Sequence, residues 1–144
     1  MAHPRLIFDF ADPEHYLEIE RIKEHDFVPE LVPARLGPPV FRCAEEIAAY
    51  REDIERRALA QGDLLPLRWP DPFPFDSEFA LLAATYAKKL GKVAAFSLAA
   101  FRQAYAGGRA LDEQTVLLAG AAAEIHPAAL LKGVTLRSVR EALR

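Results

Sequence analysis

Apolar residues near the start of the chain form short runs that are typical of strands, and a helix-start signal interrupts them. Residues 5–10 are mostly apolar, which predicts a short strand. Asp12 followed by Pro13 marks the start of a helix, because aspartate accepts a hydrogen bond from a free backbone amide there and proline in the first turn sacrifices no helical bond. We therefore expect a helix over residues 13–25.

A second extended segment is expected over residues 27–34, although Pro29 and Pro33 prevent it from being a central strand over its whole length. Farther on, apolar residues recur every three or four positions, and residues 44–61 are predicted to form an amphipathic helix that ends at Gly62. Further helices are expected from Asp76 or Ser77 to Leu90, over residues 93–106, from Asp112 to Glu124, from Pro127 as a short helix, and over residues 135–144. The first of these is expected to pack through Phe79, Leu82, Tyr86 and Leu90.

A proline-rich stretch separates the two parts of this helical region. Residues 64–75 contain four prolines, at positions 66, 70, 72 and 74, so the stretch cannot be a regular helix. Its aromatic residues Trp69, Phe73 and Phe75 have two interpretations, as the wall of a pocket for an aromatic substrate or as anchors that hold the loop on the core. The pattern favours neither.

Charge and composition narrow the classes of function. The 144 residues include 18 basic and 21 acidic side chains, mixed along the chain, with a formal net charge of −3. No basic stripe of the kind that nucleic acid requires is present. No apolar run approaches the roughly 20 residues needed to cross a bilayer, and the first residues do not form a secretory signal. With Cys43 as the only cysteine, we expect a cytoplasmic protein without a disulfide framework or dithiol chemistry, and without nucleic acid or membrane as partners.

The order of strand, helix, extended segment and many helices is typical of an α+β, mainly helical fold. The junction over residues 8–17 resembles that of DsbA-like proteins of the thioredoxin superfamily. It is most similar to the branch that holds the 2-hydroxychromene-2-carboxylate isomerases and the kappa-class glutathione transferases. The junction reads Phe8-Asp9-Phe10-Ala11-Asp12-Pro13-Glu14-His15-Tyr16-Leu17. Later segments are also similar: Arg56-Arg57-Ala58, Gly62, the proline-rich loop, Phe101-Arg102-Gln103-Ala104-Tyr105 before a glycine pair, and Asp112.

The resemblance implies a thioredoxin-like base with a large helical insertion. Residues 1–38 would form the N-terminal part of the base, residues 39–133 the helical insertion, and residues 134–144 a return helix. Members of this family continue beyond that helix into a strand preceded by a cis-proline, a further strand and a closing helix. Because a two-stranded sheet is marginal by itself, we expect the base to be incomplete unless a further segment or a partner completes it.

Both nucleophile positions of the family carry other residues here. Redox members have Cys before the proline and again two positions after it, where this chain has Asp12 and His15, and the isomerase and transferase members have Ser at the first position. We take Asp12 and His15 as candidate catalytic residues. The alternative is that Asp12 only caps the helix, which is worth about 1 kcal/mol, and that His15 is exposed without a role. The resemblance adds as candidate substrate contacts Phe10, Pro13, Trp69 and Phe73, and no metal is expected.

Two hypotheses of different class remain. The first is an isomerase-like or glutathione-related enzyme that acts on a small, aromatic substrate, with glutathione as a candidate cofactor. The carboxylate of Asp12 would repel an anionic ligand at the helix start, which normally attracts anions. The second hypothesis is a catalytically degenerate binding or assembly module of the same fold, with a protein as its partner. A homodimer is a candidate assembly for both.

Overall fold

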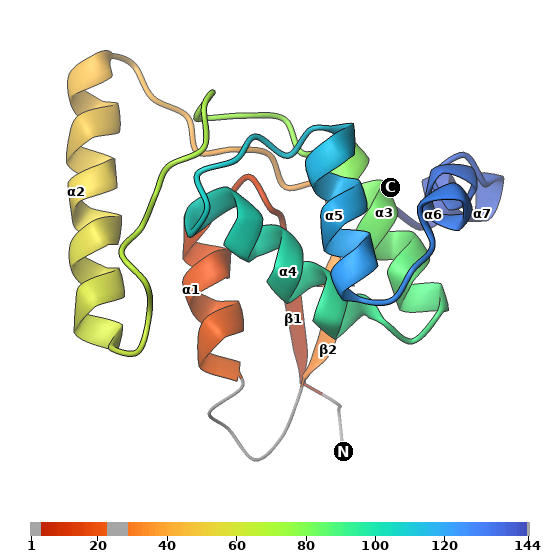
Figure 1. Cartoon of the computed structure of the whole chain (residues 1–144). Helices are drawn as coiled ribbons and strands as arrows, with labels where there is room; N and C mark the ends of the chain where they lie inside the picture. The colour runs from red at the N-terminus through yellow and green to blue at the C-terminus, as the bar shows by residue number, and fades with distance from the viewer. Residues whose placement is uncertain (1–3, 23–28, 144) are drawn as a thin grey trace.

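The computed structural model describes residues 4–22 and 29–143, and it begins with two strands joined by a helix (Figure 1). Strand β1 (Arg5–Phe8) leads to helix α1 (Pro13–Ile22), and strand β2 (Glu30–Pro33) follows. The two strands pair in parallel along their full lengths. The predicted end of the first helix at residue 25 and the predicted start of the second extended segment at residue 27 lie outside the described residues.

Strand β1 ends two residues earlier than predicted, because the backbone of Asp9 bonds to the start of α1 instead of to β2. The Asp9 N–H donates to Nδ1 of His15 at 3.0 Å, and the Asp9 carbonyl accepts from the N–H of Asp12 at 3.1 Å. The chain therefore turns directly from the strand into the helix.

The two faces of the small sheet are covered unequally. Phe8 and Leu31 point into the core and are 0% and 5% exposed, whereas Ile7, on the opposite face of β1, is 48% exposed. One face of the sheet thus supports the core, and the other is open at Ile7.

Six further helices and the loops between them follow in the described chain. Their positions agree with the predicted helices to within a few residues at each end, and the final predicted residue, Arg144, lies outside the description. The helices are α2 (Ala44–Gln61), α3 (Glu78–Lys89), α4 (Val93–Tyr105), α5 (Glu113–Ala122), α6 (Pro127–Gly133) and α7 (Arg137–Leu143). Asp112 caps α5 as predicted, since its Oδ1 accepts the N–H of Thr115 at 2.9 Å.

Helix α3 is the central helix of the bundle, and it packs against β2, α4, α5, α6 and α7. Of the residues expected to share one face, Phe79, Leu82 and Tyr86 pack on the core, whereas Leu90 is 45% exposed, and alanines on several sides of the helix are also fully buried. Alanine leaves room for close neighbours all round. The fully buried alanines are Ala80, Ala83, Ala84 and Ala87.

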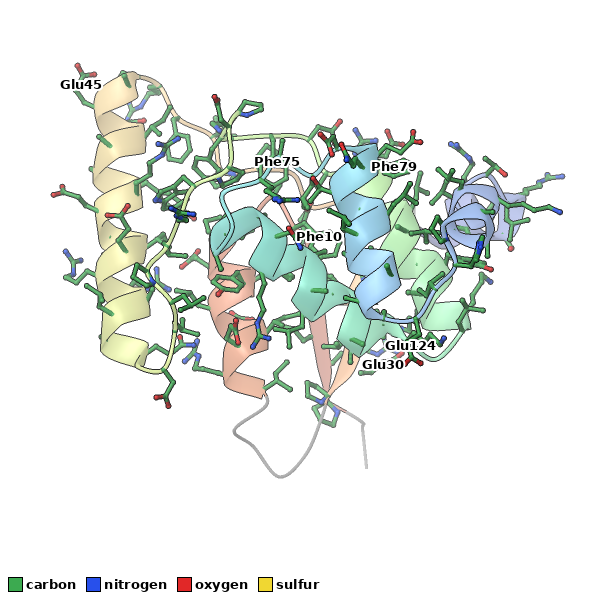
Figure 2. The ribbon with its side chains drawn as sticks, viewed as in Figure 1. Phe10, Glu30, Glu45, Phe75, Phe79 and Glu124 are labelled. Atoms are coloured by element: carbon green, nitrogen blue, oxygen red, sulfur yellow. The ribbon has the colours of Figure 1, made fainter. Side chains whose placement is uncertain are left out.

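Helix α2 stands at the edge of the molecule, and the loop that follows it runs back alongside it (Figure 1). Only Ile54 and Ala58 of this helix are fully buried. Glu45 at its outer end points into solvent (Figure 2). Arg57 on α2 forms an ion pair of 2.7 Å with Glu14 at the start of α1, which ties the two helices together.

The core is continuous from the N-terminal segments into the helical region. The ring of Phe10 lies 5.4 Å from that of Phe8, 4.7 Å from that of Phe101 and 6.3 Å from that of Phe96. The predicted boundaries of the insertion, at residues 39 and 133, therefore stay a prediction, since the core shows no break between the two parts.

No single helix in the described ranges has the length and hydropathy needed to cross a membrane. Helices α5 and α6 reach that length only together, with a bend of 118° between them.

Gly133 is expected to be required where α6 approaches α3. A Cβ atom at this position would lie 2.5 Å from two ring atoms of Tyr86, so the ring or one of the two helices must shift. We expect Gly133→Ala to lower the free energy of unfolding by about 1–3 kcal/mol, measured by urea denaturation. Tyr86→Leu in the Gly133→Ala background should recover part of the loss. Equal stability of native protein and Gly133→Ala would show that the contact is not tight.

Candidate functional site

Asp12 caps helix α1, as the sequence allowed. Its Oδ1 accepts the N–H of Glu14 at 2.9 Å, and its carbonyl accepts the N–H of His15 at 3.1 Å. The other carboxylate oxygen, Oδ2, lies 3.8 Å from Nε2 of His15. Capping therefore occupies one oxygen of Asp12 and leaves the second facing the histidine.

His15 is held at its inner nitrogen by the backbone of Asp9. Nδ1 lies 3.0 Å from the Asp9 nitrogen and 3.3 Å from the Asp9 oxygen, so it can accept from the one or donate to the other. The side chains of His15 and Asp12 are 15% and 26% exposed, so His15 is not the freely exposed residue of the alternative interpretation. Because either tautomer of the ring keeps a backbone partner, Nε2 can carry a proton or receive one.

Asp9 fixes this junction to two other parts of the chain, and sequence reasoning did not single it out. It is 1% exposed. Its Oδ1 accepts from the Ala11 N–H and from the Ser77 hydroxyl, and its Oδ2 accepts from the N–H groups of Leu36 and Gly37, both at 2.9 Å. The available signal was a charged residue between two phenylalanines at the end of a strand, since such a residue is rarely buried without partners.

A hollow of about 240 Å³ adjoins this network, and Arg35, Gly37 and Asp76 are among its lining residues. Asp9 and Ser77 also reach its wall. The carboxylate of Asp9 is already satisfied by four donors, so it positions the loop after β2 and the start of α3.

Phe10 and Pro13, which were candidate substrate contacts, are both buried. Phe10 is 0% exposed and lies in the interior of the molecule (Figure 2), and its carbonyl accepts from the hydroxyl of Tyr105 at 2.7 Å. This burial argues against direct contact of the Phe10 ring with a substrate. Phe10 instead belongs to the core on which the start of α1 packs.

Trp69 and Phe73 lie together, with ring centroids 4.8 Å apart. The indole N–H of Trp69 donates to Oε1 of Glu55 on α2 at 2.8 Å, and Phe73 is 8% exposed. The two rings therefore do anchor the proline-rich loop to α2. Trp69 is only half-buried, so its ring can also take part in a binding surface.

Tyr50 connects this aromatic group to the start of α1. Its ring stacks on that of Phe73 at 6.3 Å. Burial raises the pKa of the Tyr50 hydroxyl well above its usual range, and the negative charges of Asp12 and Glu14 raise it further. The two carboxylates at the start of α1 therefore disfavour ionisation of the Tyr50 hydroxyl.

No cluster of three His, Cys, Asp or Glu side chains suited to a metal ion occurs among the described residues. Cys43, at the start of α2, is a free and exposed thiol.

Comparison with known proteins identifies the fold. No protein-family model matches the sequence, and no curated protein matches it either. The chain is similar in structure to 2-hydroxychromene-2-carboxylate isomerase, solved in its selenomethionine form, with a TM-score of 0.78 and 18% sequence identity. The match covers 96% of this chain and 74% of that chain. It confirms the predicted α+β, mainly helical fold with a thioredoxin-like base and a large helical insertion.

Proposed function

We propose that this chain, which has the fold of an isomerase of an aromatic carboxylate, is itself an isomerase-like enzyme that moves a proton within a small aromatic acid. The observation that carries the proposal is the position of His15, whose Nδ1 lies between the N–H and the carbonyl of Asp9 while its Nε2 faces Asp12. Such a histidine can act first as a base and then as an acid without losing its support.

The proposed steps use one tautomer of His15. In that tautomer Nδ1–H donates to the Asp9 carbonyl at 3.3 Å instead of accepting the Asp9 N–H, so Nε2 has a free lone pair and accepts a proton from the substrate. The imidazolium that forms lies 3.8 Å from Oδ2 of Asp12, whose negative charge stabilises it. Nε2 then returns the proton to a second atom of the substrate, which completes an isomerisation without a net change in the enzyme.

The experiment that tests the proposal uses 2-hydroxychromene-2-carboxylate as the probe. Conversion of this compound by the native protein would be followed by proton NMR and compared with a sample without protein. We expect conversion above the uncatalysed rate, and conversion no faster than in the blank would overturn the proposal for this class of substrate.

The residues at the start of α1 do not suit glutathione, because the carboxylate of Asp12 stands where a thiolate would approach. We expect native protein to bind glutathione weakly and Asp12→Ser to bind it about fivefold to tenfold more tightly, since one repulsive charge near 4 Å is worth about 1 kcal/mol in water. Calorimetric titration measures both. Asp12→Asn, which removes the charge without supplying a hydroxyl, separates the two effects. Native binding as tight as that of Asp12→Ser would contradict this prediction.

A binding or assembly module is the second candidate, and one surface favours it. A hollow of about 260 Å³ lies between α2 and the following loop, and its lining includes Leu59 and Leu65. These two side chains are 76% and 70% exposed. Exposed apolar side chains around a hollow are typical of sites where another protein packs. An inactive native protein in the isomerase assay would favour this candidate.

A further inference from the structure

Arg51 on α2 lies against the aromatic residues of the proline-rich loop. Its guanidinium carbon is 5.3 Å from the centre of the Trp69 ring and 5.4 Å from the centre of the Phe73 ring. Both contacts are within the range of cation–π attraction. The two rings therefore hold the guanidinium in one position and stabilise its positive charge.

Within the described chain, this guanidinium has no anionic partner. Its Nε is buried and lacks any hydrogen bond. The other two arginines of α2 do have anionic partners. Arg56 and Arg57 both pair with Asp53, and Arg57 also pairs with Glu14. The two terminal nitrogens of Arg51 are not among the buried unpaired atoms, so an anionic ligand can reach them.

The carboxylate one helical turn after Arg51 does not pair with it. Glu55 follows Arg51 by one helical turn, where an ion pair would be expected, but its Oε1 accepts from the indole N–H of Trp69 at 2.8 Å. The site thus presents a fixed, planar cation next to a half-buried aromatic ring.

We infer that Arg51 binds the carboxylate of an aromatic acid, whose ring packs on Trp69. A guanidinium has parallel N–H donors that match the two oxygens of a carboxylate, and a ring stacked on the indole adds dispersion contact. This inference rests on the proposed function, because it assigns the end of the substrate that does not react. Tyr50 stacks on Phe73 and extends the group of aromatic rings beside Arg51.

The single tryptophan provides a direct test. The indole N–H resonance of Trp69 in a nitrogen-15 correlation spectrum would be followed while trans-cinnamate is added to the native protein. We expect a saturable shift of that resonance. Cinnamamide, which has the same ring but no carboxylate, should bind at least about tenfold more weakly. Absence of a saturable shift with cinnamate, or equal binding of the amide, would overturn the inference.

Variants on the same helix assign the effect to the residue. Arg51→Met keeps the apolar stem and removes the charge, so cinnamate affinity should fall about tenfold or more, whereas Arg56→Met should bind as the native protein does. Arg51→Lys retains the charge without the planar fork and should fall about threefold, which tests the inference even if Arg51→Met does not fold. Unchanged affinity in Arg51→Lys and in a folded Arg51→Met would overturn it.

This test and the test of the proposed function can fail separately. A protein that binds cinnamate through Arg51 but shows no isomerase activity overturns the proposed function alone. A protein that isomerises its substrate with the same KM in native form and in Arg51→Met overturns the role of Arg51 alone.

Discussion

His15→Gln is expected to lower the rate of isomerisation by about 10²–10⁴-fold, the range typical for loss of a positioned acid–base group. Glutamine keeps a polar side chain of similar size, but its oxygen lies one bond farther from Cβ than Nδ1 does, so the effect on the junction between β1 and α1 has to be measured as a change in stability. Glutamine cannot take and return a proton. The measurement is the initial rate with 2-hydroxychromene-2-carboxylate, together with urea denaturation to show that stability is retained.

His126→Gln is the matched control for this prediction. Nδ1 of His126 also accepts a backbone N–H, that of Ala128 at 3.1 Å, but at the exposed start of α6. The rate of isomerisation by His126→Gln should equal that of the native protein. If His15→Gln retained more than half of the native rate, His15 would be a structural residue and the proton-transfer role would be wrong.

Arg102→Met is expected to lower the free energy of unfolding by about 3 kcal/mol, because it leaves a buried carboxylate without its main cation. Nε and Nη2 of Arg102 each donate to an oxygen of Glu20 at 2.9 Å. The Glu20 side chain is 3% exposed, whereas that of Arg102 is 46% exposed. The pair joins α1 to α4, and its hydrogen bonds raise the pKa of the Arg102 guanidinium above its usual value.

Because Glu20 is buried and Arg102 is half exposed, removing one partner or the other should lower the free energy of unfolding by different amounts. Glu20→Gln leaves an arginine that water can still reach, so its cost should be smaller, about 1–2 kcal/mol. The double variant should be more stable than Arg102→Met alone, since no buried charge remains. Urea denaturation of the three variants checks the order, and a larger cost for Glu20→Gln than for Arg102→Met would contradict the explanation.

Local signals in the sequence predicted most of the helices and the start of the candidate site. The pair Asp12 and Pro13 marked the beginning of α1, and the spacing of apolar residues in α2 marked its length to the residue. Both signals act within one or two helical turns, where backbone bonding and periodicity decide the structure.

Contacts between distant segments could not be predicted in this way. The surroundings of Asp9 depend on how α3 meets the end of β1, and the position of Arg51 beside Trp69 depends on the path of the proline-rich loop. The burial of alanines on the other sides of α3 was also not predicted, because the neighbours of this helix come from several distant segments of the chain. The histidine at position 15 was predicted as a candidate, but its backbone support was not.

The four hydrogen-bond donors of Asp9 come from positions 2, 27, 28 and 68 residues along the chain. Closing loops of such different lengths costs different amounts of chain entropy, and the longest closure must wait until α3 has docked. The turn that includes Ala11 can form early, whereas the bond from Ser77 belongs to a late stage of folding. We therefore expect the junction that supports His15 to reach its native geometry only after the central helix of the bundle is in place, and the candidate site to form late during folding.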